Sequence, residues 1–394
     1  MAELIDGYLP DRPRPKWFAT ALVGLFVAAI FIGLAGVFRA PTEAPTRFEN
    51  RKTEALPALP RNWPEWRSYP ARFEVFFDDR FGLRGPLVRL DHWARAFVFG
   101  VSPVPKVLIG KSGWLYFRGE DAKAFDRWYR GNEVVSDATL AAIRTELLKR
   151  QAFLASRGIP FLVVVVPEKY SIYPEFLPDW AMPRAPRTPF DRLVTALAAD
   201  TQLHFVDLRA PLLAAKGSER LYYQTDSHWN YLGATVGYGA LMPEVAQLLP
   251  GFSIAAVPRP LYVAGVDYYS GDLAQMLGLP RQFREDDIAP LSKILATPLS
   301  RCAQLDPVAS GADVETLVYR CPNPPRFTAL IYRDSMGIPL LPMLAENFSR
   351  STFVTSAQLD ADLVERLRPD IVIEEMVERA LTGIAAYPMR PPVR

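Results

Sequence analysis

Two short segments of the sequence hold the residue types best suited to chemistry. The first is LYYQTDSHWNYLGA, in which Asp226 and His228 stand two positions apart. On an extended loop, residues at i and i+2 project to the same side, so a carboxylate and an imidazole can enter one cleft. The second is IYRDSMGIP, in which Ser335 follows an apolar run that is typical of a strand. Serine, histidine and aspartate are together the parts of a nucleophilic triad.

A serine hydroxyl is a weak nucleophile at neutral pH and needs a neighbouring base. Among the three histidines, His228 has an acidic neighbour and a polar loop around it, whereas His92 lies in an amphipathic helical pattern and His204 opens a strand pattern. We therefore predict Ser335 as the nucleophile, His228 as the base and Asp226 as the residue that orients the imidazole. Spacing alone leaves another interpretation open, in which these residues cap helices.

Composition excludes several other classes of function. Lys and Arg number 45 against 43 Asp and Glu, a balance that points to neither nucleic acid nor an acidic membrane surface as the main partner. With only two cysteines and no second histidine at ligand spacing, the chain offers no set of three metal ligands. We expect neither a metal nor a cofactor.

The N-terminal part predicts an anchored protein. Residues 17–38 form an uncharged run of 22 residues, which as a helix measures roughly 33 Å and matches a bilayer. A cleaved signal peptide is the alternative, but the run is longer than a usual signal segment. We therefore expect a cytoplasmic tail at residues 1–16, a transmembrane anchor at 17–38, a Pro-rich tether at 39–68 and a catalytic domain at 69–394.

The two cysteines, Cys302 and Cys321, enclose an 18-residue stretch rich in Gly, Ala and Asp. A disulfide between them fits an oxidising compartment such as the periplasm, whereas two unrelated buried thiols are the alternative. We predict the disulfide, which places the catalytic domain outside the cytoplasm.

The elements that must position the chemistry alternate between helix and strand. A helix at about 137–157 precedes the continuous apolar run PFLVVVV, which is typical of a strand buried on both faces of a parallel sheet. Helical and strand patterns then alternate at 189–200, 204–208, 327–332, 339–348 and 370–375, and KVLIGKSGWLYF predicts a strand pair. This order is typical of an α/β domain with a mostly parallel sheet, whose reactive groups gather beyond the carboxyl ends of the strands.

Several motifs occur in a fixed order along residues 45–385: ENR, FFDDRFGLR, IGKSGWLYF, VVVPEKYSIYPE, YYQTDSHWNYLGA, SGDLAQMLGL, YRDSMG and PDIVIEEMVER. In this order the chain resembles the alginate O-acetyltransferases of the AlgJ and AlgX type, which have an SGNH-hydrolase-like domain. By motif, Asp226 and His228 match the family's D-x-H element and Ser335 matches its nucleophile, in the family's rearranged order. We expect no carbohydrate-binding module after about residue 385, so the chain resembles the anchored AlgJ form more closely.

The resemblance implies an inner-membrane, single-pass protein with its catalytic domain in the periplasm. It also implies three partners: an exported polysaccharide, a membrane-bound acyl-transfer protein that supplies acetyl groups, and an export complex. The backbone N–H groups of Ser335 and Met336 are the candidate oxyanion donors. Lys169 and Tyr173 are candidates to line the cleft, and Trp114 and Trp229 to stack on sugar rings; the alternatives are a solvated lysine and core aromatic side chains.

The leading hypothesis is therefore an O-acetyltransferase that moves acetyl groups to hydroxyls of an exported bacterial polysaccharide through an acetyl-serine. Two alternatives stay open. One is a polysaccharide acetylesterase that uses the same triad with water as acceptor. The other is a non-catalytic, polysaccharide-binding scaffold subunit, which would not need to keep the three residues together.

Overall fold

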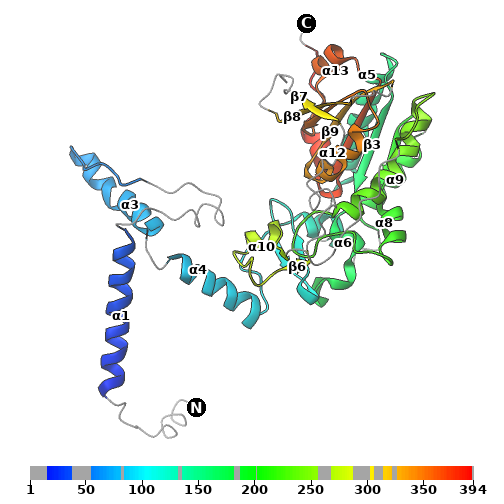
Figure 1. Ribbon diagram of the computed structural model, residues 1–394. Helices are drawn as coiled ribbons and strands as arrows, with labels where there is room; N and C mark the ends of the chain where they lie inside the picture. Colours follow the sequence, from blue (N-terminus) through cyan, green and yellow to red (C-terminus); the bar gives the residue numbers. More distant parts are fainter. Residues whose placement is uncertain are drawn as a thin grey trace. The chain divides into compact units, whose positions relative to one another are not determined.

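The structure is a computed structural model of the chain (Figure 1). It describes residues 16–37, 55–80, 84–131, 135–181, 187–200, 202–255, 268–286, 302–305, 314–321 and 326–392. Backbone contacts divide the chain into two compact units, Met1–Phe99 and Gly100–Arg394. The sequence predicted a catalytic domain from Tyr69, whereas the second unit begins at Gly100.

The first unit is helical. Its elements are α1 (Lys16–Val37), α3 (Trp63–Arg80), α4 (Arg84–Trp93) and a π-helical turn, η1 (Ala94–Val98). Asn62 and Glu65 cap α3 reciprocally: Glu65 N–H donates to Asn62 Oδ1 at 3.0 Å, and Asn62 Nδ2 donates to Glu65 Oε1 at 2.6 Å. Residues 63–68, predicted as part of the tether, are therefore helical. Residues 55–62 of the predicted tether precede this helix, and residues 39–54 lie outside the described residues.

Helix α1 occupies the stretch that was predicted to be a membrane anchor. Within the described residues, however, no helix is both long enough and apolar enough to cross a membrane. The transmembrane prediction for residues 17–38 is thus not supported. The predicted tail, residues 1–16, lies outside the described residues except for Lys16.

The second unit is built on a seven-stranded mixed sheet with the order β4-β3-β11-β9-β10-β8-β7. Its strands are β3 (Phe161–Val166), β4 (His204–Asp207), β7 (Ala303–Leu305), β8 (Thr316–Arg320), β9 (Thr328–Arg333), β10 (Arg350–Thr355) and β11 (Ile371–Val377). The five strands from β4 to β10 in this order are parallel, and β8 and β7 continue the sheet antiparallel. The α/β prediction is confirmed, with the antiparallel strands as an addition.

Helices cover both faces of this sheet. Alternate residues of β3 enter different cores, because successive side chains of a strand point to opposite faces. Leu162 and Val164 pack with α8 (Arg209–Ala215), α9 (Tyr231–Leu248) and α12 (Leu341–Ala345). Phe161 and Val163 pack with α5 (Asp137–Ala155), α7 (Pro189–Ala198), α13 (Ala361–Leu367) and α14 (Thr382–Ala386). The run PFLVVVV is apolar throughout because both of its faces are buried.

The shorter elements of the second unit lie in the connections. They are β1 (Val107–Ile109), η2 (Lys111–Gly113), β2 (Leu115–Phe117), η3 (Asp126–Arg130), α6 (Lys169–Ile172), η4 (Pro174–Phe176), η5 (Asp179–Ala181), β5 (Tyr268–Tyr269), α10 (Asp272–Met276), β6 (Glu285–Asp286), η6 (Ser335–Leu340) and η7 (Glu378–Ala380). The predicted strand pair is β1 and β2, which are antiparallel. The predicted helix at 137–157 is α5, with Ser136 as its N-cap and Gly158 in the left-handed region just after its end.

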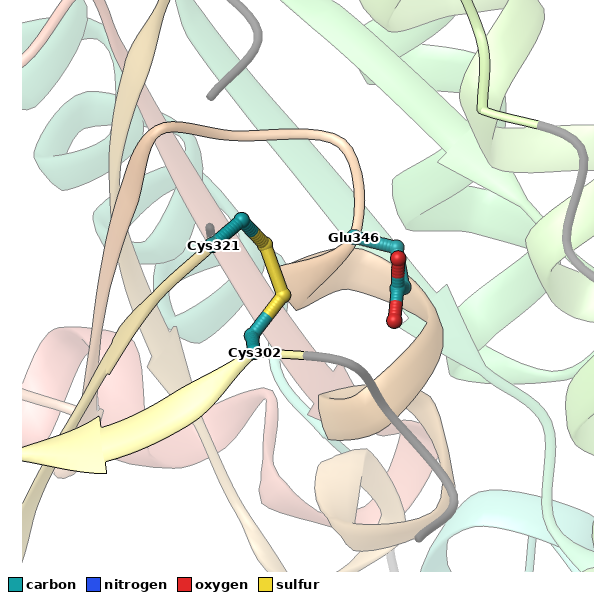
Figure 2. Close-up of side chains that lie close together, drawn as sticks. All are labelled: Cys302, Cys321 and Glu346. Atoms are coloured by element: carbon teal, nitrogen blue, oxygen red, sulfur yellow. A yellow bond between two sulfur atoms is a disulfide. The ribbon is translucent and has the colours of Figure 1, made fainter. Parts of the chain in front are cut away.

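Cys302 and Cys321 form a disulfide, as the sequence predicted (Figure 2). Cys302 lies just before β7 and Cys321 just after β8, so the bond ties the two outer strands together. Glu346, at the end of α12, lies beside the disulfide, and the Cys321 sulfur is 3.0 Å from the Ala345 carbonyl oxygen. The antiparallel edge of the sheet therefore lies against α12, the helix that follows Ser335.

We predict that replacing both Cys302 and Cys321 by Ala lowers the free energy of unfolding by about 3 kcal/mol, because the crosslink restricts the unfolded chain. The measurement is urea unfolding of the purified protein with and without reductant. The double variant should be insensitive to reductant, and an unchanged midpoint of unfolding would contradict the stabilising role.

Candidate active site

Asp226 and His228 lie together on the loop before α9, in the arrangement of an acid and base pair. His228 Nδ1 is 2.6 Å from Asp226 Oδ1, and the same oxygen accepts the His228 backbone N–H at 3.0 Å. His228 Nε2 is buried and has no hydrogen-bond partner in the described part of the chain. The pair therefore presents Nε2 as a base while Nδ1 is held by the carboxylate.

The charges of the pair support each other. Burial raises the pKa of Asp226, but the hydrogen bond and positive charge of His228 outweigh burial and hold that pKa well below its usual value. Burial lowers the pKa of His228, whereas the hydrogen bond to Asp226 and the charges of Asp226 and Asp272 more than reverse this and raise it. A carboxylate that stays ionised beside an imidazole of increased basicity suits proton transfer.

Ser335 lies at the carboxyl end of β9, at the start of the 3₁₀ helix η6. Its neighbour Asp334 fixes the turn: Asp334 Oδ1 accepts the Met336 N–H at 2.7 Å, and Oδ2 accepts the Val377 N–H at 2.8 Å. The serine turn is thus joined to the end of β11, the neighbouring parallel strand. Ser335 itself is partly exposed.

One hydrogen bond brings the two segments together. The indole Nε1 of Trp229, next to His228, donates to the carbonyl oxygen of Met336, next to Ser335, at 2.8 Å. Trp229 is fully buried, and its ring fills space that Gly237 of α9 leaves open, since a Cβ there would lie 2.8 Å from the ring. The structure therefore juxtaposes the D-x-H loop and the serine turn that the sequence pairs.

Lys169 has a different role from the one predicted. Its side chain is buried, and Nζ donates to the carbonyl oxygens of Tyr223, Gln224 and Asp226 at 3.0, 3.0 and 2.6 Å. These bonds use all three N–H donors of an ammonium group, so none remains for an oxyanion or a sugar. Burial lowers the pKa of Lys169 to about 8, against the opposing charges of Glu285, Asp226 and Asp272. Lys169 therefore holds the backbone of residues 223–226, the loop that carries Asp226 and leads to His228.

Three further predictions about the cleft are corrected. Trp229 and Trp114 are both buried, and Trp114 stacks on Phe176 at 4.6 Å, so neither offers a face to a sugar ring. Tyr173 is buried too, and its hydroxyl accepts the Leu221 N–H at 2.9 Å. Each side chain is held by core packing, the alternative that the sequence left open.

The oxyanion prediction changes for one of its two donors. The Met336 N–H is engaged by Asp334, as described above, and is not directed at the reacting centre. For the Ser335 N–H, no acceptor is found among the described residues. That N–H remains the candidate donor.

Sequence reasoning missed the segment that holds the loop from its other side. Tyr269 Oη donates to Asp226 Oδ2 at 2.5 Å, and Asp272 N–H donates to the same oxygen at 3.1 Å. Gly271 between them approaches so closely that an added Cβ would lie 2.4 Å from the Asp226 Cβ. The motif SGDLAQMLGL contains this glycine and Asp272, but only the fold shows what they contact.

Arg379 was also missed. It follows β11 in η7, forms an ion pair with Glu168 beyond the end of β3, and its guanidinium lies 4.9 Å from the centroid of Phe117. Its positive charge acts on His228 and on Asp334. The groups that follow β3, β9 and β11 therefore share one edge of the sheet, as expected for an α/β site.

Asp226, His228 and Asp272 offer ligand-type atoms that lie within 4.8 Å of one another. Each of these atoms already has a partner: His228 Nδ1 faces Asp226 Oδ1, and Asp272 Oδ2 accepts the Ser227 hydroxyl at 2.5 Å. This bonding is that of a proton-sharing network. The sulfurs of Cys302 and Cys321, near Glu346, are likewise joined to each other.

The other two histidines lie on other elements. His204 is exposed at the start of β4, and His92 belongs to α4 of the first unit.

A mixed sheet with an Asp-x-His loop and a serine turn at the carboxyl edge of its parallel strands is similar to the arrangement expected for an SGNH-hydrolase-like domain. Residues 107–297 match the family described as "SGNH hydrolase-like domain, acetyltransferase AlgX". This confirms the resemblance for the part of the chain that carries Asp226 and His228. The matched range ends before Ser335.

Curated relatives agree with this assignment. The probable alginate O-acetylase AlgJ of Pseudomonas syringae pv. tomato is 30% identical over 217 residues, which cover 53% of this chain and 51% of that protein. The protein of the same name from Pseudomonas aeruginosa is 28% identical over 220 residues, covering 54% and 51%. The chain thus spans about half the length of the curated relatives it matches.

Bacillus cereus PatB1 with a sulfonyl adduct has a similar fold. The TM-score is 0.51 at 13% identity, with 70% of this chain and 96% of that chain covered. At this identity the likeness concerns the fold.

We predict that Lys169→Met lowers kcat by roughly 10-fold to 100-fold, because three carbonyls of the catalytic loop lose their donor and small displacements of reacting groups are costly. The measurement is hydrolysis of a chromogenic acetyl ester, with circular dichroism to verify folding. Lys111→Met is the matched control, since Lys111 forms an exposed ion pair with Asp179. Equal activity of the two variants would contradict the supporting role.

Proposed function

We propose that this chain is an O-acetyltransferase that acetylates hydroxyl groups of an exported bacterial polysaccharide through an acetyl-serine on Ser335. The observation that carries the proposal is the Trp229–Met336 hydrogen bond, which joins the neighbour of His228 to the neighbour of the partly exposed Ser335. The AlgX-type family match and the AlgJ relatives support acetyl transfer to a polysaccharide such as alginate.

The proposed reaction has two halves with balanced proton transfers. In the first, Ser335 Oγ attacks the acetyl carbonyl while His228 Nε2 takes the hydroxyl proton, and the donor's leaving group departs with that proton. In the second, a sugar hydroxyl attacks the acetyl-serine, its proton passes to His228, and the serine regains a proton as the ester bond breaks. Asp226 holds Nδ1 and stabilises the imidazolium in both halves. The Ser335 N–H is the proposed oxyanion donor.

The acceptor sugar needs an aromatic surface other than the buried tryptophans. Tyr223 and Tyr269 are both partly exposed, and their ring centroids are 4.7 Å apart. Tyr269 contacts Asp226, and the Tyr223 N–H donates to the His228 carbonyl oxygen at 3.3 Å. We propose that a sugar ring of the acceptor lies on this tyrosine pair, which would place its hydroxyl near the acetyl-serine.

We further propose that the enzyme works in the periplasm. The Cys302–Cys321 disulfide supports this location, since such bonds persist in oxidising compartments. The proposed partners are a membrane-bound acyl-transfer protein that delivers acetyl groups and a polysaccharide export complex. Close association with nascent polymer would raise the local acceptor concentration and favour transfer over hydrolysis.

We predict that Ser335→Ala and His228→Ala each reduce acetyl turnover at least about 1,000-fold, and that Asp226→Asn is also strongly damaging, because the three groups act as a unit. The assay is a chromogenic acetyl ester combined with intact-mass detection of an acetyl-enzyme. The acetyl adduct should be absent from Ser335→Ala. Wild-type turnover by folded Ser335→Ala would refute the assignment of the nucleophile.

We predict that adding the correct oligosaccharide shifts the reaction from free acetate to acetylated glycan, because a bound hydroxyl reaches effective molarities of about 10⁵ M or more. Mass spectrometry of a glycan panel that includes uronic-acid polymers measures this. Tyr223→Ala should raise KM for the acceptor while leaving ester hydrolysis within about twofold. Release of acetate alone with every glycan would favour the acetylesterase.

A further inference from the structure

The histidine of the site faces a second carboxylate besides Asp226. Asp272, the first residue of α10, places Oδ2 3.8 Å from His228 Nδ1. The Ser227 hydroxyl lies between them: Ser227 Oγ is 2.5 Å from Asp272 Oδ2 and 3.2 Å from His228 Nδ1. Because the serine proton is donated to the carboxylate, a lone pair of Ser227 Oγ is left to accept from Nδ1–H.

The position of Asp272 is fixed by the backbone. Asp272 Oδ1 accepts the Ser227 N–H at 2.7 Å, and the Asp272 N–H donates to Asp226 Oδ2 at 3.1 Å. On either side, the Gly271 N–H donates to Thr225 Oγ1 at 2.9 Å and the Ala274 N–H donates to the Thr225 carbonyl oxygen at 3.2 Å. Three consecutive residues, 225–227, are therefore held by one short segment that lies about 45 residues further along the chain.

We infer that Asp272, acting through the Ser227 hydroxyl, is a second positioning carboxylate for His228, so that the imidazole is held by two acids and not one. This inference rests on the proposed function of His228 as the base. Asp226 and the Ser227 hydroxyl both contact Nδ1. These contacts fix the Nδ1–H tautomer and direct Nε2 at the reacting centre. Neither Ser227 nor Asp272 is proposed to touch the substrate.

The charges around the imidazole determine how the pKa of His228 changes when Asp272 is replaced. Asp226 and Asp272 favour the imidazolium, whereas Arg379 opposes it. On the other side of the loop, the Lys169 ammonium acts on both aspartates, and the Tyr269 hydroxyl is bonded to Asp226. Removing the charge of Asp272 therefore lowers the pKa of His228. Because the base must be neutral, the acid limb of the activity profile moves to lower pH.

The test compares Asp272→Asn, Ser227→Ala and Ser227→Thr in the full chain. We expect the acid limb of kcat/KM for a chromogenic acetyl ester to fall by roughly one pH unit in Asp272→Asn. A smaller fall is expected in Ser227→Ala, which keeps the charge but loses the bridging hydroxyl. Ser227→Thr keeps the hydroxyl and should restore the wild-type limb. Asp286→Asn is the matched control, an exposed aspartate of β6 outside the site.

A second measurement does not depend on turnover. The chain has three histidines, so selectively labelled imidazoles give few signals in an NMR titration, and His228→Gln identifies the one of interest. The His228 midpoint should fall in Asp272→Asn while those of His92 and His204 stay unchanged. If wild-type protein lacked ester turnover, the proposed function would fail while this titration still tested the inference. An unchanged His228 midpoint in folded Asp272→Asn and Ser227→Ala would overturn the inference.

Discussion

The hydrogen bond from Trp229 Nε1 to the Met336 carbonyl oxygen is the constraint on which the site depends, because it joins segments 107 residues apart. The His228 loop is supported from one side by Lys169 and from the other by the Tyr269–Asp272 segment. The serine turn is fixed separately, through Asp334, to the end of β11. A buried indole N–H that lost its acceptor would cost about 1–3 kcal/mol, so this bond holds together the two segments that carry His228 and Ser335.

The same edge of the sheet concentrates buried charge, and the arrangement explains why it is tolerated. Charged groups lose hydration on burial and persist only when they are paired or hydrogen-bonded. Lys169 is surrounded by carbonyl oxygens, Arg379 is paired with Glu168, and Asp226 receives donors on both of its oxygens. His228 Nε2 differs from these groups because it is buried without a partner in the described part of the chain. The hydrogen bonds of Asp226 and Asp272 hold the imidazole loop, and Nε2 is the ring nitrogen left for the proposed proton transfer.

The sequence predicted those features of the fold and the site that depend on residues close together in the chain. A continuous apolar run identified β3. The Asp-x-His spacing and the serine after a strand identified the two segments that carry Asp226, His228 and Ser335. The two cysteines predicted the disulfide. What it missed depends on non-local contact. Nothing near Lys169 shows that its loop folds under residues 223–226, and nothing near Asp272 shows that it meets Ser227. The short strands β7 and β8 lack the long apolar run that revealed the central strands. A tryptophan such as Trp229 is equally able to pack in the core or to stack on a sugar, so its residue type does not decide between the two.

These placements also bear on how one site can favour a sugar hydroxyl over water. The hydrogen bonds that support the imidazole act at Nδ1, which faces Asp226 and Ser227, and Nε2 has no partner in the described part of the chain. His228 keeps about a quarter of its side chain exposed, whereas Trp229 and Lys169 beside it are buried. In the proposed reaction, the partly exposed Tyr223 and Tyr269 would control access to the acetyl-serine. A sugar bound to these tyrosines would exclude water from the same volume, and the proposed selectivity for transfer would follow from that exclusion together with the fixed orientation of the imidazole.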